Sequence, residues 1–143
     1  MSFNNMMEIG KYLSFSFMAS RFIDLTKEDK KIETIELEFL IRIFYFFEAV
    51  QRGRKSTQTF EITGSTLDDL TKYQTCLEII PRMYNDSEMK KFDSIVSGFI
   101  KNIETVIKTG EIVKENLNEE IKFFTELRHY CTSKNSQMMM GCH

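Results

Sequence analysis

The stretch "EFLIRIFYFFEAV", residues 38–50, decides the fold, because it carries five aromatic rings with one arginine among them. At about 100° per residue, one narrow line of the helix holds Glu38, Arg42, Tyr45 and Ala49, and apolar side chains fill most of the rest of the circumference. A helix that is apolar almost all round is either buried centrally or spans a membrane. A span needs about 20 apolar residues, whereas this run is shorter and is interrupted by Arg42. We therefore predict a central core helix over residues 27–52.

Both ends of this helix carry their own signals. Thr26 offers an N-cap, and acidic residues follow it in the first turn, where the helix dipole favours them. Gly53 stands just past the predicted C-terminal end. Residues 54–66, "RKSTQTFEITGST", then break the helical rhythm, and their β-branched residues predict an irregular or short extended segment.

Two helices are predicted on either side of these segments. The first covers about residues 5–23, where apolar residues recur at helical spacing. The second begins at Ser65 or Thr66 and ends at Pro81, because the residue before a proline avoids the helical region.

The last two predicted helices fill the C-terminal half of the chain. One runs from Asp86 or Ser87 to Gly110, and the other opens at Asn116 or Asn118. The apolar stripe of the former consists of Phe92, Val96, Phe99, Ile103 and Val106, and the inward residues of the latter are Leu117, Ile121, Phe124, Leu127 and Cys131.

Length and composition limit the architecture. A chain of 143 residues is the usual size of one domain, and its single Pro and six Gly leave few helix breakers. No internal repeat or low-complexity linker divides it. The sequence predicts an all-α, single-domain bundle of about five helices over residues 1–134, followed by a C-terminal tail over residues 135–143.

Charge and cysteine content narrow the function. The formal net charge of −2 lacks the basic excess of a dedicated duplex-binding domain. Three cysteines are too few, and odd in number, for a disulfide scaffold, which favours a reducing compartment. Glu8 stands where a signal peptide carries positive charge. We expect a cytoplasmic protein without a membrane span.

The C-terminal tail gathers potential metal ligands. His129, Cys131, Cys142 and His143 are four donors, the number that a tetrahedral zinc site requires. However, His129 and Cys131 are two residues apart, which places them about 200° apart around a helix. We therefore expect no bound metal and no other cofactor.

Catalytic motifs are missing from the sequence. No G-x-S-x-G elbow and no glycine-rich phosphate loop occurs, and Cys76 has no local base. Paired carboxylates such as Glu119 with Glu120 stand at a predicted helix start, where dipole compensation explains them. We expect a protein without enzymatic activity.

The predicted helix over residues 5–23 points to a binding role. It is apolar on a wide arc that includes Ile9, Leu13 and Phe17, and aromatic residues and Met are favoured at interface cores. Small residues on its surface, Gly10, Ser14 and Ser20, let another helix approach closely. We predict a helical protein–protein interaction or assembly module that binds a protein partner or, as a homo-oligomer, a second copy of itself.

Two alternative functions follow from other features. A split basic face would suit a small helical subunit of a ribonucleoprotein-type, nucleic-acid-binding complex, and its residues are Arg52, Arg54, Lys55, Lys90, Lys91 and Lys101. The His/Cys tail would suit a metal-binding or redox role.

Overall fold

The computed structural model describes residues 3–55 and 77–140 and has the predicted all-α architecture. Residues 77–83 form a helical segment. Four long helices make up most of the fold: α1 (Phe3–Leu25), α2 (Thr34–Lys55), α4 (Met89–Thr109) and α5 (Asn118–Met140). Shorter elements connect them: the strands β1 (Lys30–Lys31) and β2 (Glu111–Ile112), and the 3-10 turns η1 (Asp86–Glu88) and η2 (Lys114–Leu117).

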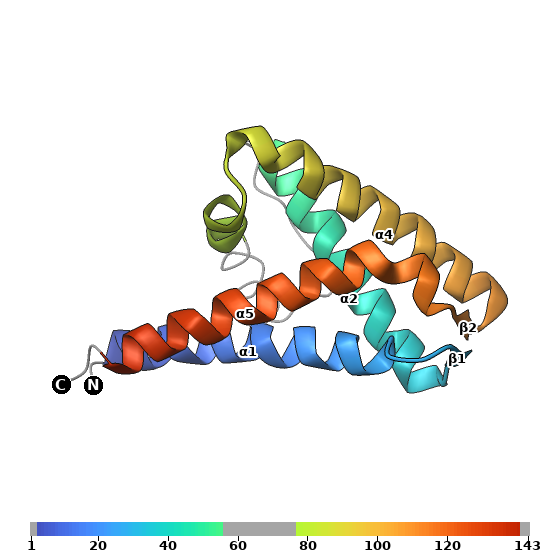
Figure 1. Cartoon of the computed structure of the whole chain (residues 1–143), viewed down its shortest axis with the longest axis horizontal. Coiled ribbons are helices and arrows are strands. Elements are labelled where there is room, and N and C mark those ends of the chain that lie inside the picture. Colours follow the sequence, from blue (N-terminus) through green and yellow to red (C-terminus); the bar gives the residue numbers. More distant parts are fainter. Residues whose placement is uncertain (1–2, 56–76, 141–143) are drawn as a thin grey trace.

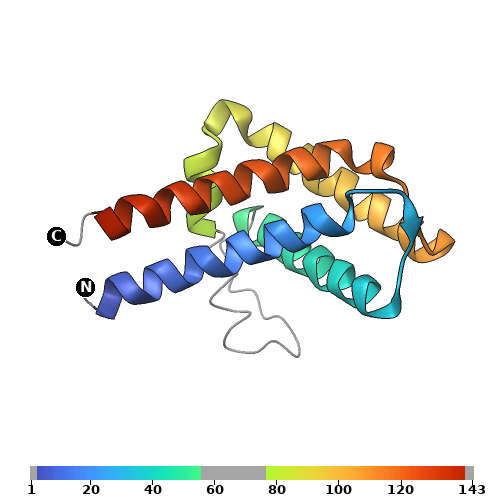
Figure 2. The same cartoon turned by 60° about the horizontal axis from the view of Figure 1, so that its bottom comes forward.

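The long helices pack as two pairs. α1 lies along α5 in antiparallel orientation, so the two ends of the chain lie at the same end of this pair (Figure 1). α2 packs on α4 and crosses the other half of the α1/α5 pair (Figure 2). The strands β1 and β2 pair antiparallel, with Lys30 opposite Ile112, and tie the approach to α2 to the end of α4.

Five phenylalanine rings hold the four long helices together. Phe47 of α2 packs edge-on against Phe99 of α4 and against Phe123 and Phe124 of α5, with ring centroids 6.3, 5.5 and 5.5 Å apart. Phe22 of α1 lies 4.2 Å from Phe124 and 5.7 Å from Phe99. We call these five residues the aromatic cluster. Aromatic pairs at these separations add to the stabilisation from buried area.

Helix α2 is the central hydrophobic helix that the sequence predicts. It is not buried all round, however, because Arg42 and Tyr45 face solvent. Ala49 lies on the same line of the helix as Arg42 and Tyr45 but is buried. The buried residues of α2 are Leu40, Ile43, Phe47, Ala49 and Val50.

The predicted start of α2 at residue 27 is wrong. Thr26 ends α1 instead: its Oγ1 donates to the Phe22 carbonyl at 2.8 Å, and its backbone N–H donates to the same oxygen at 3.1 Å. The following residues pair with the segment after α4, where Ile32 N–H donates to the Gly110 carbonyl at 2.9 Å. A Thr side chain can cap the start of a helix, but it can also donate to a carbonyl of the preceding turn, as Thr26 does. The distant pairing of the residues after Thr26 decides between these two roles.

The predicted end of α2 near Arg52 is also wrong, because the helix runs through Gly53 to Lys55. Glycine lowers helix stability but does not by itself end a helix. Residues 54 and 55 are therefore helical, and the rest of the predicted extended segment over 54–66 lies outside the described residues.

The helix before α4 departs from its prediction at Pro81. Its start at Ser65 or Thr66 lies outside the described residues, and the part that the structure describes runs over residues 77–83. Pro81 does not end it. A proline lacks an N–H donor and crowds the carbonyl four residues before it, but the turn after it still closes, since Tyr84 N–H donates to the Ile80 carbonyl at 3.0 Å.

The helix α4 confirms its prediction closely. Asn85 caps η1 in a capping box with Glu88, and the helical path continues to Gly110. Gly110 adopts a left-handed conformation with φ 72°, which glycine tolerates, and its N–H donates to Val106 at 2.8 Å. The buried residues are those of the predicted stripe: Phe92, Val96, Phe99, Ile103 and Val106.

The helix α5 begins at Asn118, as predicted, but continues to Met140. Residues 135–140 are thus a helical extension rather than a separate tail. Cys131 is the last apolar residue of the predicted stripe, and beyond it α1 supplies polar contacts to the helix: the Ser16 and Thr132 hydroxyls lie 3.5 Å apart, and Asn135 Nδ2 donates to the Ile9 carbonyl at 3.4 Å. Phe123 is buried, although the helical pattern of the sequence does not mark it, whereas Ile121 is half-buried.

Truncation of the central ring tests the role of the aromatic cluster. We expect Phe47→Ala to lower the free energy of unfolding by about 3–5 kcal/mol, the range for a buried phenylalanine, because this side chain is 2 % exposed. The matched control is Tyr45→Ala, which removes a ring that is 61 % exposed on the same helix. Chemical denaturation of both variants measures the difference, and equal losses would contradict a central α2.

Candidate functional site

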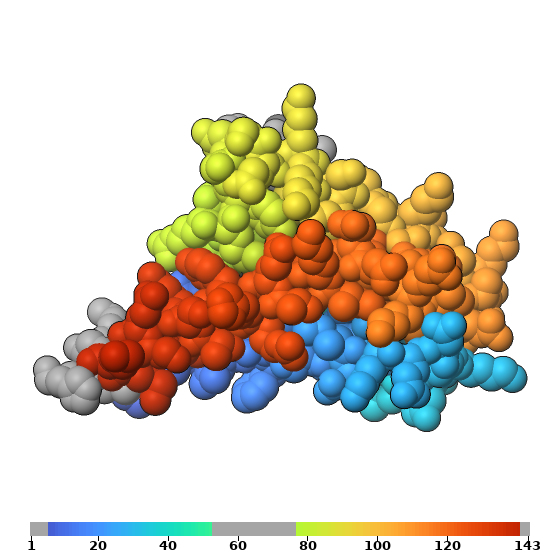
Figure 3. Space-filling model, viewed as in Figure 1, coloured from blue at the N-terminus to red at the C-terminus, as the bar shows by residue number. Residues whose placement is uncertain are grey.

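The helix α1 has two apolar faces on opposite sides. The inner face packs into the bundle through Tyr12, Phe15, Ala19 and Phe22, whose spacing keeps them on one side of the helix. On the outer face, large apolar side chains point to solvent: Met6 is 57 % exposed, Leu13 42 % and Phe17 69 %. In Figure 3, α1 (blue) emerges below α5 (red) along the length of the pair.

One residue of α5 extends this outer face. The contact between the hydroxyls of Ser16 and Thr132 marks one flank of the α1/α5 pair. Ile9 lies seven residues before Ser16, and Met139 seven residues after Thr132, so helical periodicity places both on that flank. Met139 is 58 % exposed. We call Met6, Ile9, Leu13, Phe17 and Met139 the α1 surface.

Glu8 and Lys11 of α1 point away from this surface, whereas Arg21 and Asp24 border it beyond Phe17, four and seven residues further along the helix. Lys11 Nζ pairs with Glu8 at 3.2 Å, and the guanidinium of Arg21 lies 4.1 Å above the ring of Phe39 in α2. Between Met6 and Phe17, the residues on the same line of the helix are Gly10 and Leu13, which are uncharged. An uncharged apolar centre is the usual composition of the core of an interface.

The area of the α1 surface suits a protein interface. At about 200 Å² for a large apolar side chain, the exposed parts of Met6, Leu13, Phe17 and Met139 amount to roughly 450 Å². A standard interface covers about 800 Å² on each partner, of which about 57 % is apolar, or roughly 450 Å². Exposed residues on other elements, such as Ile35 of α2 and Ile107 of α4, are scattered singly, which is normal for a protein surface.

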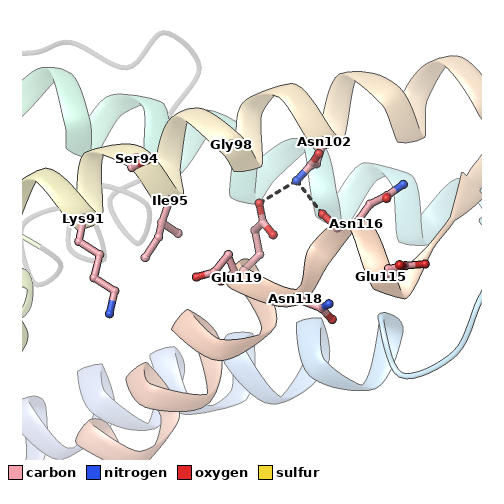
Figure 4. Close-up of a pocket in the computed structure, with 10 residues that line it drawn as sticks. Lys91, Ser94, Ile95, Gly98, Asn102, Glu115, Asn116, Asn118 and Glu119 are labelled. Atoms are coloured by element: carbon pink, nitrogen blue, oxygen red, sulfur yellow. Dashed lines mark hydrogen bonds between the residues drawn. The ribbon is translucent and has the colours of Figure 1, made fainter.

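A second candidate site is a polar cleft of about 340 Å³ between α4 and the start of α5 (Figure 4). At its base, Asn102 Nδ2 donates to the Glu120 carboxylate and to the Asn116 carbonyl, both at 2.9 Å. Gly98 lies beside the carboxylate, and a Cβ at this position would make an ordinary contact with Glu120 Oε1 at 3.7 Å. The lining residues are Lys91, Ser94, Ile95, Gly98, Asn102, Glu115, Asn116, Asn118, Glu119 and Glu120.

Glu120 is the unusual group of this cleft. Its side chain is buried, and burial raises the pKa of its carboxyl above the ordinary value of 4.5, against the hydrogen bond from Asn102. From its place at a helix start, the sequence predicts only a dipole-compensating role for Glu120. The helical spacing indicates that Glu120 is buried, since it lies on the same side of the helix as Phe124, Leu127 and Cys131. The hydrogen bond between Asn102 and Glu120 joins α4 to the start of α5, next to the segment that connects the two helices. We therefore interpret the buried carboxylate as a structural contact.

Metal ligation is not supported by the described part of the tail. His129 is exposed and Cys131 is fully buried, as their spacing predicts. Burial raises the pKa of the Cys131 thiol to about 12, so it stays protonated and is a poor ligand. Cys142 and His143 lie outside the described residues, and within residues 3–55 and 77–140 no three His, Cys, Asp or Glu side chains gather as a metal site would need.

The basic residues of the nucleic-acid hypothesis lie on two helices. Lys90, Lys91 and Lys101 are exposed on α4, whose start lies beside the end of α2 (Figure 1). Arg52 of α2 is paired with Glu48 at 2.5 Å, and the side chains of Arg54 and Lys55 lie outside the described residues. Acidic residues of η1, Asp86 and Glu88, stand just before these lysines in the chain, so the potential at this end is mixed.

Comparisons with known proteins add no relative: no family model, no curated protein and no solved structure matches this chain. Among the described helices, none combines the length and apolar character needed to cross a membrane.

The pH dependence of stability tests the burial of Glu120. Above pH 4.5 the unfolded carboxyl ionises first, whereas the folded one keeps its proton up to its raised pKa. Because the folded state then binds more protons, this group lowers stability as pH rises through that window. We expect Glu120→Gln, which keeps an acceptor for Asn102, to gain stability over the native chain progressively above pH 4.5. Denaturation at a series of pH values measures this gain.

The matched control for this measurement is Glu119→Gln, which neutralises the exposed neighbouring residue. Its stability should follow the native chain with the same pH dependence. A Glu120→Gln profile that runs parallel to the native one would contradict a buried carboxyl.

Proposed function

We propose that this chain is a non-enzymatic helical interaction module that self-associates through the α1 surface. The observation that carries the proposal is the outward projection of Phe17, 69 % exposed, in line with Leu13 and Met6 on a face that carries no charge between Met6 and Phe17. A chain of this size can bury such rings in its own core, and the aromatic cluster does so with Phe22 from the same helix. The opposite face of α1 is therefore available for a partner.

Energy favours this association. At about 25 cal/mol per Å², burial of roughly 900 Å² of apolar surface from two copies contributes on the order of 20 kcal/mol. Association costs about 4–15 kcal/mol in lost translational and rotational freedom. Ordering of side chains at the interface adds a further cost of about 0.5–1.5 kcal/mol for each side chain, so the association depends on a well-buried anchor. We assign this role to Phe17, because aromatic residues dominate interface energetics.

The remaining features fit a binding protein better than an enzyme. Glu120 is engaged by Asn102 and belongs to the packing of α4 on α5. Cys131 is a free, buried thiol whose raised pKa does not suit a nucleophile. A free thiol in a chain with three cysteines supports a reducing compartment such as the cytoplasm.

Sedimentation of a variant at the anchor tests the proposal. We expect the native chain to show a concentration-dependent monomer–dimer equilibrium. Phe17→Ala should weaken the dimer at least about 100-fold, since the dimer loses the ring twice and each 1.4 kcal/mol is tenfold. Circular dichroism should show the same fold, because the side chain is solvent-exposed in the monomer.

The control is Tyr45→Ala, which removes an aromatic ring of similar exposure from α2. Its dimerisation constant should stay within about threefold of the native value, since scattered surface residues contribute little. A native chain that remains a monomer at every concentration would overturn self-association.

A further inference from the structure

The α1 surface carries both a knob and a notch. Phe17 is the knob, and we call Gly10 the notch, because it has no side chain and the space above its backbone is open: a Cβ added there would meet no atom within 4 Å. The two positions are seven residues apart, so they lie within about 20° of one line along the helix and about 10 Å apart along its axis. A surface with a knob and a notch on one line is complementary to a second copy of itself.

Resting on the proposed self-association, we infer that two copies dock α1 against α1 in antiparallel orientation, with Phe17 of each chain seated over Gly10 of the other. The two-fold axis then passes between Leu13 and Ser14, midway between Gly10 and Phe17. This arrangement uses the same patch on both chains and closes at two copies. A head-to-tail contact between knob and notch would leave one of each unused and would not close.

The other positions of α1 suit this geometry. Small residues at Gly10, Ser14 and Ser20 let the two backbones approach closely. Leu13 lies beside its own copy near the axis. The charged residues Glu8 and Lys11 pair with each other within one chain and point away from the docking face. Arg21, which lies over Phe39, and Asp24 share the side of Phe17 but lie about 11 and 16 Å from the two-fold axis along the helix. They therefore fall at the rim of the interface, where charged groups stay in water.

The area supports a second copy as the occupant. The roughly 450 Å² of apolar surface on each chain matches the apolar share of one side of a standard interface. An isologous dimer would cover this patch on both chains at once, so no further partner is needed to remove it from water.

Filling the notch tests the inference. Gly10→Gln places a good helix former at an open position, so the melting temperature of the monomer should rise by a few degrees. The same side chain blocks the seat of Phe17, and the dimer should weaken at least about tenfold in sedimentation. The control for helix propensity is Gly98→Ala in α4, where the new Cβ makes only an ordinary contact at 3.7 Å; its dimerisation should be unchanged.

Cross-linking tests the orientation, in a chain whose Cys76 and Cys142 are replaced by serine. Under antiparallel docking, Leu13→Cys lies close to its own copy and should form a disulfide-linked dimer on mild oxidation. Met6→Cys lies about 22 Å from its own copy along the axis and should remain uncross-linked. Parallel docking would cross-link both variants and overturn the inference.

The outcomes separate this inference from the proposed function. A native dimer that tolerates Gly10→Gln, or that leaves Leu13→Cys uncross-linked, would overturn the antiparallel α1 docking and leave self-association standing. A native chain that never dimerises would overturn both.

Discussion

The packing of Phe22 and Phe47 against three rings of α4 and α5 is the contact on which the rest of the structure depends. It joins four helices that are far apart in the sequence, with centroid separations between 4.2 and 6.3 Å. The chain has no disulfide among its described cysteines to share this role. Buried aromatic rings therefore supply the long-range constraint that fixes the orientation of α1 and α2 relative to α4 and α5.

This contact fixes how α1 is oriented about its own axis. With Phe22 in the cluster and Tyr12 and Phe15 on the same side, Leu13 and Phe17 can only face outward. Towards the chain ends the α1/α5 pair relies more on polar contacts, and Asn135 is buried there with an Oδ1 that has no partner within the described part of the chain. An amide buried between two helices disfavours shifted packings, since it loses its hydrogen bond to Ile9 in any other register.

The spacing of apolar residues predicts the buried side chains of a helix correctly where one face of that helix is buried. It predicts the stripe of α4 residue by residue, together with its end at Gly110. It fails where a distant segment decides: Thr26 carries a capping signal but ends α1, because residues 29–32 pair with the chain after α4. It also fails along residues 135–140, where α1 offers a surface that no local pattern reveals.

The α1 surface could likewise be predicted only in part from the sequence. Ile9, Leu13 and Phe17 can be predicted as a set because they share one helical arc, and the structure exposes Leu13 and Phe17. Which of the two apolar faces of α1 points inward cannot be read from that arc, since the choice depends on Phe99 and Phe124. The pair Asn102–Glu120 is equally non-local, because its members lie on different helices.

The central claim is that α1 turns Phe22 inward and Phe17 outward to a second copy. An isotope-filtered nuclear Overhauser experiment on a mixture of labelled and unlabelled chains tests it most directly. The account predicts contacts within one chain from the Phe22 ring to the rings of Phe99 and Phe124, and contacts from the Phe17 ring only between chains. Contacts within one chain from Phe17 to the rings of α2 or α5 would contradict the account.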